Sequence, residues 1–322
     1  MGAPELSGMC APVGVGASLS PVTRALSVLL RTVQATSTIE RPAAPPETSS
    51  RTWSKAFNDL VEGAKQRQLW AHLGWQDIKQ RYRRSVIGPL WITISMGVMV
   101  TGLGILYGSL FGTDLREKLP HLAVGFIIWE FIRNCVTEGT EVFIKNEGLM
   151  KQLPAPLSVH IYRLVWRQTL FFLHNLIIYF LLLAIFALAG TPIPVNWTII
   201  VAIPALLLIM INGIWVATLF GVIATRFRDI PPVIQSIMTM ALFMSPITWG
   251  MFEFEHNDQN AWRQIFVDGN PLSHYIAIFR DPLIGFDQHL YHWYWVLGCT
   301  VVGFLLAAVV LRNYRARVPY WV

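Results

Sequence analysis

Long apolar runs separated by short polar connections dominate the chain from residue 89 onward. A helix of about 20 mainly apolar residues crosses the hydrocarbon core of a bilayer. Five runs come close to that length, at residues 89–111, 165–188, 198–224, 233–249 and 292–311. The pattern therefore predicts an all-α integral membrane protein.

A sixth run, residues 121–144, begins apolar and then carries charges. Its polar residues fall on one side of a helix and its apolar residues on the other. The polar set is Glu130, Arg133, Asn134, Thr137, Glu138 and Glu141. Because charges facing lipid are costly, we predict a sixth crossing whose polar side faces a pathway, a partner helix or the cytoplasm.

The first 88 residues differ from the rest. Residues 1–50 are rich in Ala, Pro, Ser and Thr and contain no aromatic residue, which predicts a disordered extension. Residues 51–88 then show apolar side chains at helical spacing, as in Trp53, Phe57 and Leu60 and again in Trp75 and Ile78. This spacing predicts amphipathic helices that lie on the inner membrane surface, pack on the protein's own inner side, or do both.

Basic residues set the predicted orientation. Lys79, Arg81, Arg83 and Arg84 precede Pro89, which suits the first turn of a membrane helix. Basic side chains beside a crossing stay in the cytoplasm, so this flank and the basic connections near residues 145–163, 226–228 and 312–317 are predicted inside. With six crossings, both termini are then cytoplasmic.

The last predicted external segment, residues 250–291, is acidic and too long for a turn. Within it, residues 271–284 are apolar over a length that suits a re-entrant or interfacial helix. This stretch predicts a helical hairpin that dips back from the outer face and caps a pore. A small external lid with no gating role is the alternative.

Composition narrows the classes of protein to which the chain can belong. The chain has 322 residues, of which 54% are hydrophobic and 14% charged, so the bilayer is its solvent. The net charge is +6, but the charged residues lie between apolar segments and form no basic face of a soluble domain. This distribution excludes a nucleic-acid partner. The three cysteines have no zinc or disulfide spacing, so we predict no metal site. No phosphate-loop motif occurs, so ATP and Mg would be held by another subunit.

Five strings occur in order along the chain, on the predicted sides of the membrane: DIKQRYRRSVIGPLW, VGFIIWEFI, KNEGLMKQLPAPLS, ATRFRDIPPVIQ and NPLSHYIAIFRDPL. Together they resemble the membrane subunit of type-2 ABC exporters of lipid-linked polysaccharides, the permeases of O-antigen, teichoic acid and cell-wall galactan. The actinobacterial galactan exporters are the members that the chain resembles in particular. The resemblance covers residues 53–322.

The resemblance implies a bacterial inner-membrane homodimer that works with two nucleotide-binding ATPase subunits and moves a polymer on an undecaprenyl-type or decaprenyl-type lipid. Residues 145–157 resemble the coupling helix that docks on the ATPase, and residues 226–229 resemble an inner loop. Read from the residues alone, the first is a solvated helical connection and the second an ordinary basic loop. The residues concerned are Asn146, Glu147, Leu149, Met150, Lys151 and Leu153 for coupling, Arg226, Arg228 and Asp229 for the loop, and Asn270, Pro271 and Arg280 for the external gate.

A sugar polymer would favour aromatic faces, because sugar rings present C–H patches beside their hydroxyls. The candidates are Trp91, Tyr107, Trp129, Phe243, Trp249 and Phe252, each of which has interfacial anchoring or packing as its alternative role. The lipid phosphate would be attracted by Arg81, Arg83 and Arg84.

Two other classes stay open. A membrane glycosyltransferase or lipid-modifying enzyme would need paired carboxylates, for which Glu253 and Glu255 are the external candidates. An ion-coupled transporter would need a titratable group in mid-membrane, for which Glu130 is the best candidate, although Arg133 one turn away indicates a local ion pair.

Overall fold

A computed structural model describes residues 51–83, 85–88, 90–112, 114–152, 155–249 and 267–322. The predictions for residues 1–50, Arg84, Leu153, Phe252 and the first part of the external hairpin lie outside the described residues. Every regular element among the described residues is helical, which confirms the all-α class.

The elements follow one another along the chain in this order: α2 (Trp53–Lys65), α3 (Arg67–Arg81), α4 (Leu90–Phe111), α5 (Leu115–Thr140), η1 (Ile144–Asn146), α6 (Glu147–Gln152), α7 (Ser158–Leu188), η2 (Trp197–Val201), α8 (Ala202–Arg226), α9 (Ile230–Met244), α11 (Pro271–Ile284), α12 (Leu290–Tyr314), η5 (Arg315–Arg317) and α13 (Val318–Trp321).

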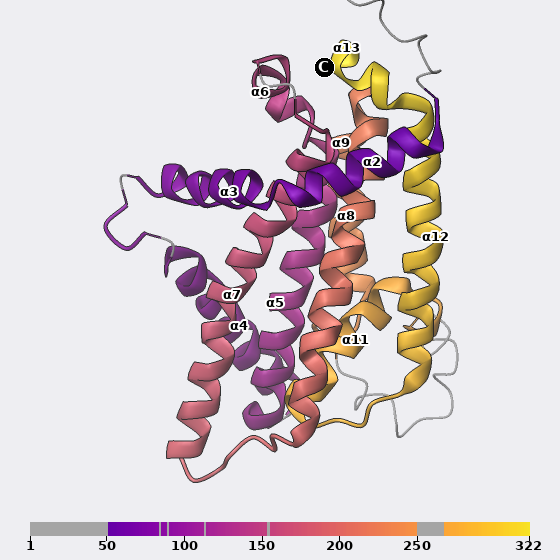
Figure 1. Cartoon of the computed structure of the whole chain (residues 1–322). Coiled ribbons are helices and arrows are strands. Elements are labelled where there is room, and N and C mark those ends of the chain that lie inside the picture. Colours follow the sequence, from indigo (N-terminus) through magenta and orange to yellow (C-terminus); the bar gives the residue numbers. More distant parts are fainter. Residues whose placement is uncertain (1–50, 84, 89, 113, 153–154, 250–266) are drawn as a thin grey trace, which may run out of the picture. The chain divides into compact units, whose positions relative to one another are not determined.

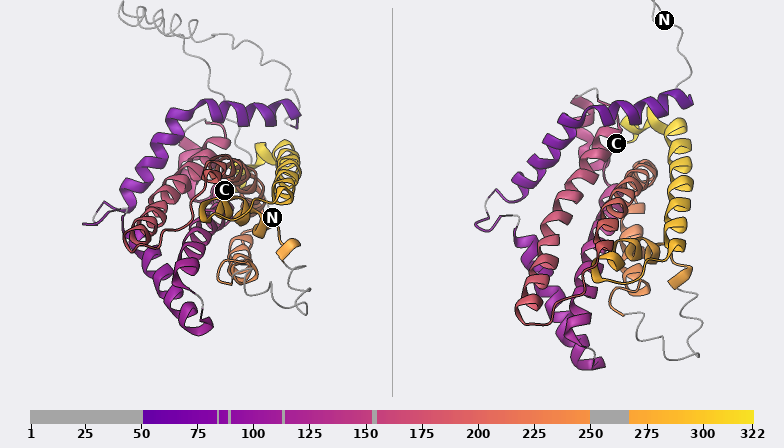
Figure 2. Two further views of the ribbon diagram at one scale, coloured as in Figure 1. Left: turned by 90° about the horizontal axis from the view of Figure 1, so that it is seen from below. Right: turned by 60° about the horizontal axis from the view of Figure 1, so that its bottom comes forward.

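Helix α5 lies at the centre of the bundle formed by residues 49–322, with α7 on one side and α8 on the other (Figure 1). Its apolar side chains, among them Leu122, Ile127 and Trp129, are buried in the main core, where α4, α9 and α11 also contact it. Helices α2 and α3 run across one end of the bundle (Figures 1 and 2). We call this end, where α6 and α13 also lie, the α6 end.

Among the described residues, five helices have the length and composition of membrane spans: α4, α5, α7, α8 with η2, and α12 with η5 and α13. The predicted crossing at residues 233–249 is wrong in extent, because α9 has 15 residues and ends at Met244. Ser245 has an extended backbone and precedes Pro246, and a proline disfavours helical conformation in the residue before it. A helix of 15 residues is about 22 Å long, short of the roughly 30 Å hydrocarbon core.

The helix predicted at residues 271–284 is confirmed over the same residues. Asn270 caps it by accepting a hydrogen bond from the Leu272 backbone N–H at 3.0 Å, and Pro271 occupies the first turn. The helix ends at Gly285, whose φ of 78° is the left-handed conformation that favours glycine. Twelve of its 14 residues are buried. The helix is therefore packed inside the protein and does not lie along its surface.

Helices α5 and α8 approach closely at Gly139. A Cβ added there would lie 2.9 Å from the Cα of Ala217 and 3.1 Å from its Cβ, and that backbone cannot rotate away. We expect Gly139→Ala to destabilise the protein by about 1–3 kcal/mol through overpacking. Thermal unfolding in detergent would measure the change. Gly298→Ala on α12 is the matched control, because a Cβ there meets nothing within 4 Å. Equal shifts in the two variants would contradict a close helix crossing.

Candidate coupling surface and adjoining cavities

Helix α6 has six residues, too few for a stable isolated helix, and its neighbours hold it in place. Met150 packs against the core cluster at the α6 end, which includes Phe143 and Leu157. Asn146 donates to the Val142 carbonyl at 2.7 Å just before the helix begins. Leu149 is half-buried and lies outside the core clusters, so part of its apolar surface is free.

Two charges of α6 pair with each other. Glu147 and Lys151 form an i, i+4 ion pair at 2.5 Å. The hydrogen bond from Lys151 lowers the pKa of the Glu147 carboxyl. Both side chains are exposed, so the pair contributes little to stability, and it leaves a charged rim around Leu149.

The predicted inner loop lies beside the C-terminal residues. The Arg228 side chain donates to the Trp321 carbonyl at 3.2 Å, and the Arg226 guanidinium lies 5.9 Å from the Trp321 ring centroid. Asp229 occupies the N-cap position of α9, but its side chain makes no capping hydrogen bond. The Asp229 backbone is helical, whereas a capping residue is usually extended.

Helix α2 is tied to α7 by Asp59. The two carboxylate oxygens of Asp59 accept from the backbone N–H groups of Leu157 and Ser158, both at 3.2 Å, and so cap α7 from another helix. Burial raises the pKa of Asp59, against the opposing effect of Arg315. The buried side of α2 carries Ala56, Asp59 and Gly63, while Trp53 and Phe57 are exposed. The side of α2 that packs on the protein is therefore different from the side that carries the exposed Trp53 and Phe57.

An ion network joins α3, α5 and α7. Asp77 accepts from Arg163 at 2.5 and 2.8 Å and from Arg167 at 2.9 Å. Arg167 also pairs with Glu138, which accepts from Gln168 at 2.8 Å. Arg163 reaches the loop before α6 as well, donating to Asn146 at 3.0 Å.

Two polar cavities flank this network. The first, of about 470 Å³, is lined by the polar side of α5 together with Arg81 and Gln235. The second, of about 370 Å³, lies among α3, α5 and α7 and is lined by Asp77, Lys145, His160, Arg163 and Arg167. Arg81 and Glu138 line both. The predicted polar face of α5 is confirmed, as is the local pair of Glu130 with Arg133 at 2.5 Å.

The predicted headgroup cations have different surroundings. Lys79 lies 5.9 Å from the Trp75 ring, and Arg81 lies 5.6 Å from the Phe171 ring. Arg83 is exposed beyond the end of α3.

Arg280, predicted at an external gate, is buried with 4% exposure. It donates to the Pro246 carbonyl at 2.6 Å, pairs with Asp281 at 3.2 Å and contacts His121 at 3.3 Å. It therefore fixes the turn after α9 against α5 and α11. Asn270 also reaches this turn, donating to the Ser245 hydroxyl at 3.2 Å.

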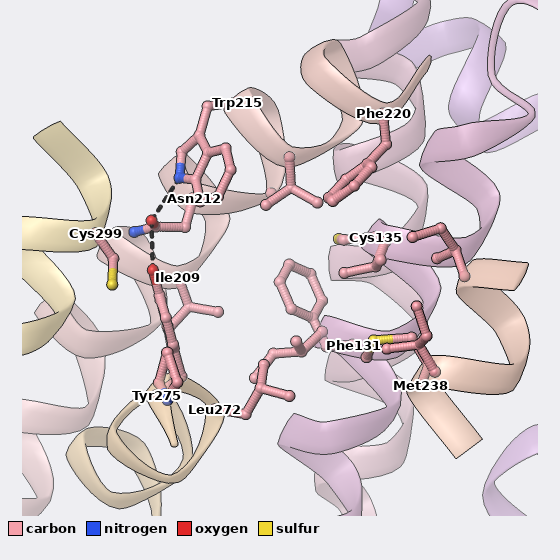
Figure 3. Close-up of a pocket in the computed structure, with 17 residues that line it drawn as sticks. Phe131, Cys135, Ile209, Asn212, Trp215, Phe220, Met238, Leu272, Tyr275 and Cys299 are labelled. Atoms are coloured by element: carbon pink, nitrogen blue, oxygen red, sulfur yellow. Dashed lines mark hydrogen bonds between the residues drawn. The ribbon is translucent and has the colours of Figure 1, made fainter. Parts of the chain in front are cut away.

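An apolar cavity of about 320 Å³ lies among α5, α8, α9, α11 and α12 (Figure 3). Asn212 accepts from the Trp215 indole N–H at 2.6 Å and from the Tyr275 hydroxyl at 2.7 Å, shown as dashed lines in Figure 3. These polar atoms satisfy one another, so the cavity presents a hydrocarbon-like wall, with Phe131, Met238 and Leu272 on it.

The comparisons with known proteins agree on one class. The family model described as ABC-2 type transporter matches residues 68–284, more than half of the chain. Two relatives are each named O-antigen export system permease protein RfbA, from Klebsiella pneumoniae. One is 21% identical over 244 residues, covering 74% of this chain and 88% of the relative. The other is 22% identical over 211 residues, covering 64% and 76%. The chain belongs to the ABC-2 type transporter family.

Membership in the ABC-2 family makes this chain a multi-pass membrane subunit of a transporter, whose partner is a nucleotide-binding ATPase subunit. The matched residues include α6, the ion network and α11. The resemblance that the five sequence strings indicated is therefore confirmed at the level of a type-2 ABC transporter membrane subunit.

The described aromatic residues that were predicted to line a channel in this ABC-2 subunit differ in exposure. Trp129 is 2% exposed in the core, so its ring has no free face for a polymer. Trp91 on α4 and Phe243 on α9 are exposed, and Trp249 donates to the Phe243 carbonyl at 3.0 Å. Tyr107 is half-buried beneath Lys118, at 5.6 Å.

Sequence reasoning missed the partners of the ion network. Asp77, Arg163, Arg167 and His160 were not proposed as a group, although Arg167 falls inside the apolar run predicted at residues 165–188. A charge within a predicted crossing marks a functional or partnered position, so the position of Arg167 could have indicated the ion network from the sequence.

Proposed function

We propose that this ABC-2 subunit exports a lipid-linked polysaccharide from the cytoplasm across the bacterial inner membrane, driven by ATP hydrolysis on the partner ATPase. The observation that carries the proposal is the match to two O-antigen export permeases along most of their length. The short helix α6, held by its neighbours with Leu149 partly free, supports the docking role.

The α6 end is the cytoplasmic end in this proposal. Basic residues concentrate there, among them Lys145, Lys151, Arg226 and Arg312, as expected for residues that resist translocation. The chain passes from α12 to α13 at the same end, which makes the C-terminus cytoplasmic.

Two copies of the chain form the pathway between them. ATPase subunits of such transporters act as a pair, and a two-fold pair is best matched by a two-fold membrane part. Exposed aromatic side chains such as Trp91 on α4 and Phe243 on α9 are the candidates for contact with the polymer or with the second copy. In this proposal the carrier is an undecaprenyl-type or decaprenyl-type lipid, and galactan is the polymer that the sequence resemblance favours.

Reconstitution tests the proposal. The chain is placed in liposomes with and without its ATPase subunit, and ATP hydrolysis and polymer translocation are measured. We expect polymer-stimulated hydrolysis and translocation only in the complete complex. Translocation by the chain alone would overturn the proposal, as would a complex whose hydrolysis does not respond to polymer.

A further inference from the structure

We propose that the cavity of about 370 Å³ among α3, α5 and α7 is a binding site for the phosphate group of a lipid, one site in each copy of the chain. The proposal rests on the proposed function only for the assignment of the α6 end to the cytoplasmic membrane surface. The binding chemistry is argued from the cavity itself.

The charge balance of this cavity favours an anion. Its lining carries four cations and two carboxylates, a net charge of +2. The cations are Arg81, Lys145, Arg163 and Arg167, and the carboxylates are Asp77 and Glu138. Lys145 also forms an exposed ion pair with Glu141 at 2.5 Å, which offsets its charge. The cavity therefore keeps a net charge of about +1. A phosphate diester or monoester is a matching ligand.

Arg81 is the cation with most capacity for a new partner. Arg163 and Arg167 are held by Asp77 and Glu138, whereas no carboxylate of the described residues forms an ion pair with Arg81. Its guanidinium lies 5.6 Å from the Phe171 ring, which holds it in place without using up its N–H donors. A planar guanidinium presents two parallel N–H groups to a phosphate.

Two buried polar atoms among the lining residues have no protein partner. His160 is 3% exposed, and its Nδ1 makes no hydrogen bond with any of the described residues. The Nε of Arg167 is likewise buried without a partner. Buried polar atoms are nearly always hydrogen-bonded, because an unsatisfied one costs about 1–3 kcal/mol. In the proposal the two side chains turn toward the bound phosphate, so that its oxygens accept from the Arg167 Nε–H and, with Nδ1 protonated, from the His160 imidazole.

The position of the cavity favours a lipid as the source of the phosphate. Arg81 ends α3, and α4, a membrane-spanning helix, begins at Leu90. The cavity lies where α3 meets α7 and where Arg163 contacts Asn146 in front of α6. A phosphate at this place is at the level of the headgroups of the inner leaflet.

The test is lipid binding to the full-length chain in phosphatidylcholine nanodiscs, titrated with phosphatidic acid and followed by native mass spectrometry. We expect one phosphatidic acid per copy of the chain, bound at least tenfold more tightly than phosphatidylcholine. Arg81→Gln is expected to weaken this binding about tenfold, the effect of one charge-assisted hydrogen bond. Arg67→Gln is the matched control, since Arg67 has the same charge at the exposed start of the same helix and does not line the cavity; we expect less than a twofold effect.

A second variant separates ligand binding from folding. His160→Leu removes a buried atom that lacks a partner, so we expect an unchanged or raised thermal midpoint together with weaker phosphatidic acid binding. Inorganic phosphate added to the chain in detergent tests the other source. Binding of inorganic phosphate that is lost in Arg81→Gln would support phosphate recognition and identify a soluble ligand in place of a lipid.

Two results would overturn the site. One is no preference for phosphatidic acid together with no binding of inorganic phosphate. The other is equal weakening by Arg81→Gln and Arg67→Gln, which would show general surface attraction only. These titrations contain no ATP and no ATPase, so their failure is distinct from failure of the exporter proposal, which is decided by polymer-stimulated hydrolysis.

Discussion

Replacing Asp77 with Asn is expected to lower the free energy of unfolding by about 2–4 kcal/mol. Asp77 is the shared acceptor for Arg163 and Arg167, whose side chains are 16% and 22% exposed. Without the Asp77 charge, Arg163 loses its carboxylate partner and Arg167 keeps only Glu138. Breaking a buried pair costs more than the pair itself contributes. Because the two arginines are still partly exposed to solvent, the expected loss is smaller than for a fully buried ion pair. Thermal unfolding in detergent, followed by tryptophan fluorescence, measures the effect.

Glu141→Gln is the control for this prediction. Glu141 pairs with Lys145 at 2.5 Å, but the two side chains are 37% and 64% exposed, so we expect a change within about 0.5 kcal/mol. Removing one of the two arginines in the Asp77→Asn background should recover part of the loss, because the charges of the network are coupled. Similar midpoints for Asp77→Asn and Glu141→Gln would show that the network does not hold α3 to α7.

Local sequence signals were sufficient where a helix is bounded by its own residues. The bounds of α11 follow from Asn270 and Pro271 at its start and Gly285 at its end, and all three were visible in the sequence. The polar side of α5 was likewise predictable, because helical spacing alone places Glu130, Arg133 and Glu138 together. The end of α9 was also within reach, since Pro246 lies inside the run that was assigned to one crossing.

Contacts between distant segments could not be predicted. The start of α7 at Ser158 depends on the Asp59 carboxylate, supplied from α2 about one hundred residues earlier. The partners of Arg163 and Arg167 come from α3 and α5, and spacing within one helix carries no information on them. The burial of Arg280 could not be predicted for the same reason, because its main partner is the Pro246 carbonyl in another segment.

The docking role of α6 predicts that Leu149→Asp lowers polymer-stimulated ATP hydrolysis by the reconstituted complex at least tenfold. In the proposed complex Leu149 is an apolar contact on the ATPase, and an aspartate there would bury an unpaired charge at the interface. The side chain is half-buried in the subunit and lies outside its core clusters, so we expect a small change in thermal midpoint. Sequence reasoning placed Met150 in the same role, but Met150 packs on the core at the α6 end.

Met150 therefore provides the comparison that separates docking from folding. Met150→Asp is expected to lower both hydrolysis and the thermal midpoint, because it places a carboxylate against the apolar core cluster at the α6 end. Leu149→Met keeps an apolar side chain of similar volume and should retain hydrolysis close to that of the unmodified subunit. If the Leu149→Asp complex keeps both hydrolysis and polymer translocation, the ATPase docks elsewhere. Helix α6 is then an ordinary solvated connection between α5 and α7.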